Sequence, residues 1–476
     1  MVFSSIVFLF LFLPLVLVSY YLLPHRWRNL QLLLVSLFFY AWGEGIYTAV
    51  MLTSIIVNYF IGRAFTNKTG RARKRLLAFG VFLNLLPLLF FKYSPFIMKN
   101  LGALVSLPPA AGQWSVHLPL GISFFTFQII SYLVDVYRGT IAPQTNLPKL
   151  GLFKALFPLL IAGPIVRYKD IYFQLGVRKV TLAGFSHGIE RFILGLGKKV
   201  LLANPLGQMA DAVFSLPTQE LSTAAVWIGA TSYMLQIYFD FSGYSDMAIG
   251  LGRMFGFTFL ENFNFPYISK SIQEFWRRWH ISLSTWFRDY LYIPLGGNRR
   301  GDTATAVNLL IVFTICGLWH GASWNFLVWG LFHGFFLALE RGRFGTVLKS
   351  TPAFVRLSYA LLVVLVGWVF FRAESMDYAG KFIAVMFGFA ATDILNYKVF
   401  SQLTPHFYSV YLSAIVCCTP LFSSIYFRGS QGDAAAIATG SGVVGIVKTV
   451  LLGALLMLSV SSLATGAYNP FIYFRF

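Results

Sequence analysis

The segment SIQEFWRRWHISLSTWFRDYLYIPLGGN (residues 271–298) is followed, after one apolar run, by CGLWHGASW (residues 316–324). Together they hold two of the seven histidines, His280 and His320, and each of these follows a tryptophan. Most of the remaining chain consists of apolar runs, whereas this segment gathers arginines, carboxylates and tryptophans. Charged side chains are costly at membrane depth, so such a cluster indicates a functional site or a water-filled cavity.

The composition of the chain sets the fold class around this segment. Of the 476 residues, 57% are hydrophobic and 11% are charged, whereas soluble domains carry roughly 25% charged residues. A soluble protein of this composition would expose large apolar patches. We therefore predict an all-α polytopic membrane protein whose apolar runs span the bilayer.

The charge pattern predicts an orientation. The chain has 37 lysines and arginines against 17 acidic residues, a formal net charge of +20. The basic residues lie in short clusters between apolar runs, which favours cytoplasmic loops on anionic lipids and argues against a nucleic-acid partner. The strongest cluster, from Arg63 to Arg75, predicts a cytoplasmic loop. Met1 and the loop over residues 99–117, around Gly112, would then lie outside the cytoplasm.

Two segments are predicted to form helices that do not cross the whole bilayer. Residues 150–165 are apolar but too short to cross the bilayer, as expected for a re-entrant segment. Residues 184–203 mix charged and apolar side chains at helical spacing, which is typical of an interfacial helix. Residues 43–45, Gly-Glu-Gly, predict a hinge between two consecutive apolar runs.

A pair of carboxylates follows the apolar run over residues 222–239. We predict that this span ends at Asp240 and that Ser245 or Asp246 caps the next helix. Two carboxylates six residues apart are also compatible with a cation site or with acid–base chemistry. Asp240 is the better functional candidate, as a residue that orients a histidine or an arginine.

The two histidines allow two interpretations. A Trp-His pair can anchor a helix at the membrane interface. However, His320 follows the apolar run Val307–Trp319 directly and precedes Gly321, and a helix that breaks at membrane depth must line a cavity or be buried in protein. Imidazole titrates near neutrality and suits proton transfer. We therefore predict one pocket that both His280 and His320 reach.

The three cysteines, Cys316, Cys417 and Cys418, lie in apolar runs. Their spacing predicts neither a disulfide framework nor a zinc site, and we expect no metal. Cys316 lies one helical turn before His320, where a thioester carrier is conceivable. We interpret it as a buried, inert thiol.

Long stretches of the chain resemble the membrane-bound O-acyltransferase (MBOAT) family. The resemblance rests on FWRRWHISLSTWFRDYLYIPLGGN (275–298) and GLWHGASWNFLVWGLFHG (317–334). Three other stretches are similar to the alginate O-acetyltransferase branch of that family: YFDFSGYSDMAIGLGRMFGF (238–257), LPLGISFFTFQIISYLVDVYRG (118–139) and FPLLIAGPIVRYKD (157–170). The resemblance implies a single integral membrane domain over residues 1–476. Re-entrant and interfacial helices would surround a central cavity, with a catalytic core over 118–340 and scaffold or partner-facing helices over 345–476.

The pocket is compatible with acyl transfer to a hydroxyl group. No GxSxG elbow is present, so a hydrolase-type serine is not indicated. A thioester donor supplies the leaving group, and a histidine can act as general base on the incoming hydroxyl. We assign that role to His320, whereas His280 orients the substrate or donates a hydrogen bond. His333 is interpreted as a polar packing residue.

Further residues are predicted to form the cavity or bind the donor. The cavity walls are Trp276, Trp279 and Trp319, and Arg277 or Arg288 would meet the donor's phosphates. Asn298 and Asp240 complete the candidate set. The arginines of WRRW are equally compatible with cytoplasmic anchors.

The resemblance implies a function at a bacterial inner membrane. An acetyl group from cytoplasmic acetyl-CoA, a substrate and not a bound cofactor, would pass to periplasmic partner proteins of the SGNH type. The partners would acetylate an exported polysaccharide, alginate first, with cellulose or another polymer as alternatives. D-alanyl transfer to teichoic acid and a proton-coupled transporter or flippase are competing interpretations. No internal repeat is visible, which argues against an inverted-repeat transporter.

Overall fold

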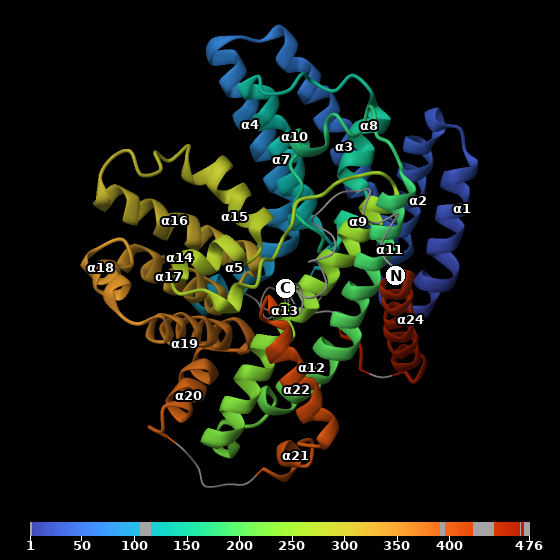
Figure 1. Ribbon diagram of the computed structural model, residues 1–476. Coiled ribbons are helices and arrows are strands. Elements are labelled where there is room, and N and C mark those ends of the chain that lie inside the picture. Colours follow the sequence, from blue (N-terminus) through green and yellow to red (C-terminus); the bar gives the residue numbers. More distant parts are fainter. Residues whose placement is uncertain (1, 105–115, 391–395, 422–441, 467, 471–476) are drawn as a thin grey trace. The chain divides into compact units, whose positions relative to one another are not determined.

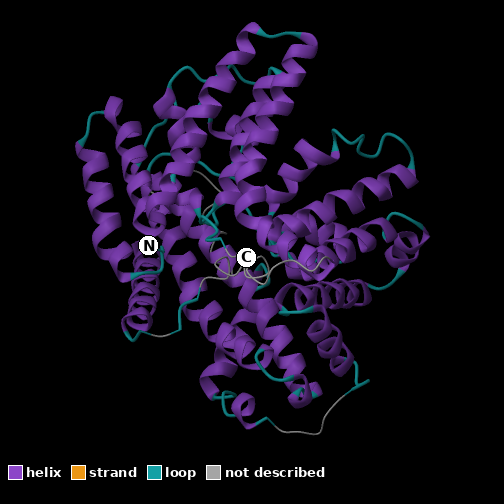
Figure 2. Ribbon diagram, turned by 180° about the vertical axis from the view of Figure 1, so that it is seen from behind, coloured by secondary structure: helices purple, strands orange, loops and turns teal. Residues whose placement is uncertain are grey.

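The computed structural model describes residues 2–104, 116–390, 396–421, 442–466 and 468–470. Within these ranges every regular element is a helix, and none of the described residues forms a strand (Figure 2). Five helical stretches in the described part are long and apolar enough to cross a membrane: His25–Asn67, Gly70–Gly102, Asp302–His320, Ala353–Arg372 and Gly445–Ala464. The protein is therefore an all-α polytopic membrane protein, as its composition predicts.

The chain forms two compact units. Unit 1 contains Met1–Gly188 and Ala248–Leu260, and unit 2 contains Ile189–Met247 and Glu261–Phe476. Two of the three boundaries within the chain fall inside long helices, α11 (Leu182–Gly197) and α13 (Thr223–Met254), and the third follows Leu260 in a loop. The proposed division of one membrane domain into a core over 118–340 and C-terminal helices over 345–476 stays a prediction.

Unit 1 is built mainly from the N-terminal helices (Figure 1). These are α1 (Leu13–Leu22), α2 (Arg28–Glu44), α3 (Thr48–Ala64), α4 (Gly70–Leu88), α5 (Ser94–Leu104), α7 (Ile122–Arg138), α8 (Leu147–Ala155), α9 (Phe157–Leu160) and α10 (Tyr168–Ile171). The apolar segment that we predict to be re-entrant forms the two short buried helices α8 and α9, which are separated at Leu156.

The predicted hinge between α2 and α3 is confirmed, since Gly45 ends α2 with a positive φ of 53°. The predicted basic loop is wrong beyond residue 69, because α4 begins at Gly70 and contains the last four basic residues of the cluster. Arg73 explains part of this difference. Its guanidinium donates to the carbonyls of Val136 at 2.7 Å and Tyr137 at 3.3 Å, so it provides donors for carbonyl groups in the last turn of α7.

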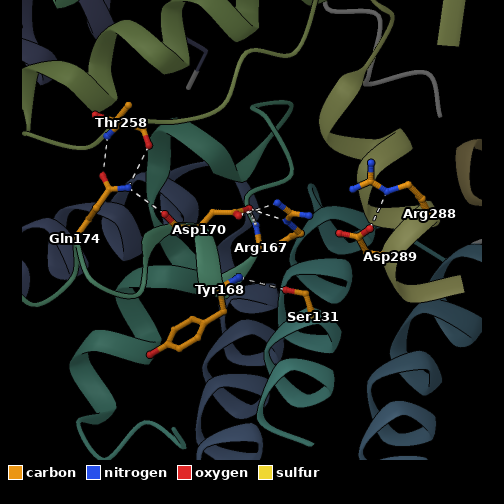
Figure 3. Close-up of polar contacts among 8 residues, drawn as sticks. All are labelled: Ser131, Arg167, Tyr168, Asp170, Gln174, Thr258, Arg288 and Asp289. Atoms are coloured by element: carbon orange, nitrogen blue, oxygen red, sulfur yellow. Dashed lines mark hydrogen bonds and ion pairs between the residues drawn. The ribbon is translucent and has the colours of Figure 1, made fainter. Parts of the chain in front are cut away.

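Hydrogen bonds tie the distant segment Ala248–Leu260 to the rest of unit 1. The carbonyl of Phe255 accepts from the Tyr20 hydroxyl at 2.8 Å and from Arg178 Nε at 3.0 Å. The Gln174 side chain donates to the carbonyl of Thr258 and accepts from its amide, at 3.2 and 2.7 Å (Figure 3). Backbone groups outside regular structure are thus satisfied by buried or partly buried side chains.

Unit 2 contains most of the second half of the chain. Its helices are α12 (Asn204–Phe214), α14 (Ile272–Arg278), α15 (Ile281–Phe287), α16 (Asp302–His320), α17 (Trp324–Leu339), α18 (Arg343–Ser350), α19 (Ala353–Arg372), α20 (Met376–Met386), α21 (Tyr397–Phe400), α22 (Pro405–Cys417) and α24 (Gly442–Ala464), with the first part of α13. The predicted helix end at Asp240 and the predicted cap at Ser245 or Asp246 are wrong, because α13 runs through all three residues. Asp246 does not end the helix because Arg191 and Lys198 neutralise it, each with a nitrogen 2.7 Å from the carboxylate.

Helices α16 and α17 form a tightly packed hairpin that carries His320 at its turn. Gly317 of α16 and Gly330 of α17 allow the close approach. A Cβ atom on Gly317 would lie 2.1 Å from the Phe326 carbonyl oxygen, and one on Gly330 would lie 2.2 Å from the Phe313 carbonyl oxygen. Backbone cannot move away as a flexible side chain can, so both positions require glycine.

Gly330→Ala should therefore separate α16 from α17. We expect the free energy of unfolding to fall by about 1–3 kcal/mol, the usual cost of overpacking, with a lower thermal midpoint in detergent. Gly380→Ala in α20 is the matched control, because a Cβ there meets nothing within 4 Å. An unchanged midpoint for Gly330→Ala would contradict the close packing of the hairpin.

Candidate active site

His280 sits at a sharp change of chain direction between two short helices. Helix α14 is capped by the Ser271 hydroxyl, which accepts from the Glu274 amide at 3.0 Å, and α14 ends before Trp279. His280 then adopts a left-handed conformation, with φ 43° and ψ 54°, and α15 begins at the next residue. Among the described non-glycine residues only His280 and Phe265 have a positive φ. Such conformations are costly and recur at functional sites.

Asn262 holds His280 in this position. The Asn262 backbone carbonyl accepts from the Ile281 amide at 2.9 Å, and its side-chain oxygen accepts from the Ser282 amide at 3.1 Å. The same side-chain oxygen lies 3.1 Å from His280 Nδ1. His280 is 1% exposed, and its Nε2 atom has no hydrogen-bond partner among the described residues.

Burial controls the charge of His280, which lies outside the five candidate spans. Removal from solvent lowers the pKa of His280 from 6.5 to about 3, because burial penalises the charged imidazolium. The ring is therefore neutral at physiological pH. A neutral imidazole can accept a proton or a hydrogen bond, which a permanently charged ring cannot do.

His320 ends helix α16 and lies among aromatic rings. Its ring centroid lies 4.9 Å from that of Trp319, 5.1 Å from Trp329 and 5.2 Å from Phe371. The chain leaves the helix at Gly321, where a Cβ atom would clash with the Phe326 ring at 2.1 Å. His320 is 7% exposed.

Trp319 links the two histidines. Its ring centroid lies 6.4 Å from that of His280 and 4.9 Å from that of His320. The structure thus places both predicted histidines in one aromatic cluster, although they come from segments that are 40 residues apart in the chain. Phe241 of α13 closes the cluster on the His280 side, with ring centroids 4.6 Å apart.

A cavity of about 1050 Å³ lies within unit 2 next to this cluster. Phe371 and Phe326 line it, and Phe371 also packs edge-on against the His320 ring. The Arg372–Asp211 ion pair, at 2.6 Å, forms part of the polar wall. The other polar residues that line the cavity include Gln208, Ser215, Gln236, Ser323, Glu374, Ser401, Gln402, Thr404, His406 and Tyr468.

The two other predicted wall residues, Trp276 and Trp279, are buried in the same aromatic core. Trp276 lies 5.7 Å from Trp329, and Trp279 lies 4.9 Å from Trp368, between ring centroids. His333 packs between rings as expected, 5.2 Å from Trp276 and 5.1 Å from Trp329. It is fully buried.

Asp240 lies beside the cluster but is paired with a lysine. The Lys199 ammonium is 2.7 Å from its carboxylate, and both side chains are almost completely buried. The prediction was that Asp240 orients a histidine or an arginine; the described ion pair is with Lys199. Its neighbour Phe241 is the α13 residue that reaches His280.

The predicted donor-binding residues lie on the surface of unit 2. Arg277 and Asn298 are exposed. Arg288 is 59% exposed and forms an ion pair with the adjacent Asp289 at 2.8 Å (Figure 3). None of the described hydrogen bonds or ion pairs joins these three residues to His280 or His320.

Two residues that hold His280, Asn262 and Ser282, were not predicted from the sequence. Asn262 belongs to the stretch ENFNFPY, where an asparagine stands among aromatic residues before a proline, and this is the one sequence signal that points to it. Cys316 is buried one turn before His320, in agreement with an inert thiol.

Comparison with known proteins decides the family. A model of the membrane-bound O-acyltransferase family matches residues 142–377, which include both histidines, Asn262 and α16. The chain is 42% identical, over the full length of both proteins, to the probable alginate O-acetylase AlgI of Azotobacter vinelandii. The chain belongs to the MBOAT family.

Other MBOAT proteins show the same likeness. The chain is 44% identical, again over the full length of both proteins, to the probable alginate O-acetylase AlgI of Pseudomonas putida. It is 37% identical to the peptidoglycan O-acetyltransferase of Helicobacter pylori, over 82% of this chain and 80% of that protein. The protein is thus a membrane acyltransferase, and the two-histidine cluster is its candidate active site.

The buried, neutral state of His280 predicts how stability depends on pH. The unfolded chain binds a proton near pH 6.5 and the folded chain only near pH 3, so unfolding takes up a proton between these values and stability falls as the pH is lowered. His280→Asn, which tolerates the left-handed backbone, should make this fall shallower. Thermal midpoints measured from pH 7 to pH 4 in detergent test this.

The control for this prediction is His406→Asn, which replaces an exposed histidine and should not reproduce the shallower fall. A wild-type pH dependence in His280→Asn would mean that His280 is not held neutral by burial.

Proposed function

We propose that the protein transfers an acetyl group from cytoplasmic acetyl-CoA across the bacterial inner membrane to periplasmic partner proteins of the SGNH type, for O-acetylation of an exopolysaccharide, most directly alginate. The observation that carries the proposal is the burial of His280 and His320 in one aromatic cluster beside a large polar-walled cavity. The names of the full-length relatives, alginate O-acetylases, support the polymer.

The proposed reaction transfers an acetyl group from a thioester to a hydroxyl group. The acceptor hydroxyl oxygen attacks the thioester carbonyl carbon, so that a C–O bond forms and the C–S bond breaks. An imidazole takes the hydroxyl proton and the leaving thiolate receives a proton, which gives an acetyl ester and free CoA. General-base catalysis of this kind contributes roughly 10²–10⁴-fold.

The position of His320 suits the role of general base. Its ring is edge-on to Phe371, which lines the cavity, and Ser323 lines the cavity three residues later. An acceptor in the cavity would therefore approach the reaction centre from the Phe371 side. The aromatic walls exclude water, which protects a reactive thioester from hydrolysis.

The distribution of basic residues supports the direction of transfer. Helix α16 begins directly after Arg299 and Arg300, which the positive-inside rule places in the cytoplasm, and His320 is at its opposite end. Arg343 and Lys349 precede α19, and the cavity lies at the other end of that helix, at Arg372. The charges at the starts of α16 and α19 therefore support an acceptor cavity that faces the periplasm.

The donor is proposed to bind on the opposite, cytoplasmic side. The exposed guanidinium group of Arg277 would meet phosphate groups of acetyl-CoA, and the exposed Arg288 would do so by exchanging its ion pair with Asp289. A carrier protein that delivers a D-alanyl thioester is the alternative donor, and it would need a protein-docking surface in place of a nucleotide site.

His320→Ala tests the catalytic assignment. Purified protein in nanodiscs, incubated with acetyl-CoA labelled in the acetyl group and a soluble SGNH-type partner, should transfer label to the partner. We expect His320→Ala to lose at least about 10²-fold of this rate, the usual contribution of a general base, with unchanged protein yield and elution volume.

The control is His117→Ala, which removes an exposed histidine of unit 1 and should transfer label at the wild-type rate. Wild-type transfer by His320→Ala would refute the assignment. Absence of acetyl-CoA cleavage by the wild type, with transfer from a D-alanyl carrier protein, would replace the proposed donor.

Cysteine labelling tests the proposed orientation. In a background without the three native cysteines, Ala72→Cys should react with a membrane-impermeant maleimide only after permeabilisation, and His117→Cys should react in intact cells. Both positions are exposed. Gly112, in the same predicted outer loop, lies outside the described residues. Reversed accessibility would contradict a periplasmic N-terminus.

A further inference from the structure

Hydrogen bonds to both the oxygen and the nitrogen of the Asn262 side-chain amide fix its orientation. Its oxygen accepts from the Ser282 amide at 3.1 Å and from the Ser282 hydroxyl at 2.8 Å, and it lies 3.1 Å from His280 Nδ1. Its nitrogen donates to the Ser245 hydroxyl of α13 at 3.1 Å. All four residues are buried.

These contacts define which atom of Asn262 faces the histidine. A backbone amide can only donate, so the atom of Asn262 that faces the Ser282 amide must be the oxygen. His280 Nδ1 faces the same oxygen and must therefore carry a proton, because two acceptors would repel one another. The orientation of the asparagine and the tautomer of the histidine are thus set by one backbone group.

The proton on Nδ1 decides what Nε2 can do. A neutral imidazole carries one N–H and one lone pair, so Nε2 holds the lone pair. This atom is buried and has no protein partner among the described residues. A buried lone pair without a partner costs free energy, and a bound substrate or water that donates to it would recover that cost.

We infer that His280 enters acyl transfer as a hydrogen-bond acceptor through Nε2, and that Asn262 is the positioning residue that enforces this role. The inference rests on the proposed function. Two roles were open to His280: orienting the substrate or donating a hydrogen bond. A neutral ring whose proton is held at Nδ1 by Asn262 cannot donate through Nε2. His280 can therefore orient the substrate only by accepting a hydrogen bond at Nε2. It accepts this hydrogen bond from another donor group of the substrate or from a bound water, while His320 takes the proton of the acceptor hydroxyl, and His280 does not stabilise the thioester oxygen.

The backbone supports the same conclusion. Asn262 also fixes the peptide after His280 through the 2.9 Å bond from the Ile281 amide to its carbonyl, while His280 is in the left-handed region. A side chain that only packed would not need this conformation, which costs free energy for a residue with a Cβ atom. The segment around Asn262 therefore maintains one direction of the imidazole ring.

The tautomer can be measured directly. Protein labelled with ¹⁵N-histidine in nanodiscs should show, at neutral pH, one neutral histidine protonated at Nδ1 that is missing from the spectrum of His280→Asn. A His280 signal protonated at Nε2 would overturn the inference, whether or not any substrate has been identified.

Variants of Asn262 test the positioning role. Asn262→Ala should shift His280 toward protonation at Nε2 and lower kcat by about 10²-fold, at the lower end of a general-base contribution, with an unchanged KM for acetyl-CoA. Asn262→Asp keeps the acceptor oxygens and should restore protonation at Nδ1 and a rate above that of Asn262→Ala. Asn396→Ala is the matched control, since Asn396 is buried in unit 2 and bonds Glu220 at 2.8 Å.

The outcomes separate this inference from the proposed function. Donor cleavage that depends on His320 but is unaffected in Asn262→Ala, with the tautomer unchanged, would refute the inference alone. A wild type that cleaves no acetyl-CoA would refute the proposed donor, while the wild-type tautomer would still decide the state of His280. If Asn262→Ala does not fold, the wild-type spectrum and Asn262→Asp decide.

Discussion

Polar groups in the interior of a membrane protein must find their partners inside the protein, because the hydrocarbon offers none. Unit 2 meets this constraint with ion pairs that join neighbouring helical segments. Asp240 is paired with Lys199, and Asp246 with Arg191 and Lys198, each at 2.7 Å. These pairs allow α13 to continue as one helix through a stretch with two carboxylates. The active-site cluster then packs against the same helix.

The candidate active site contains one buried atom, Nε2 of His280, for which the described residues supply no partner. Around it the packing is tight: glycines bring α16 against α17, and rings of Trp319, Trp329 and Phe371 surround His320. Within that packing, Asn262 satisfies one nitrogen of His280, and the other has no partner among the described residues. Aromatic packing that holds the Nε2 acceptor of His280 in place is prepared for a substrate group, and the preparation costs no reorganisation when the substrate arrives.

Local features of the sequence predicted a large part of this account. The composition predicted an all-α membrane protein, and Gly45 marked a hinge because a glycine tolerates positive φ. The two Trp-His pairs predicted the histidines that the fold brings together. Prediction from the sequence failed where a side chain pairs with a residue far away in the chain. Asp246 was predicted to be a helix cap because its partner Arg191 lies 55 residues earlier. The role of Asn262 was missed because it depends on a left-handed residue 18 positions later.

The protein combines MBOAT membership with a buried pair of histidines, and the central claim is that the two act as a unit in one transfer step. The most direct measurement is a double-mutant cycle on acetyl-CoA cleavage in nanodiscs, with His280→Asn, His320→Ala and the double variant. Residues that act in one step are not additive. The account predicts that the double variant loses about as much rate as the more severe single variant. Losses that multiply, as for two independent sites, would contradict it.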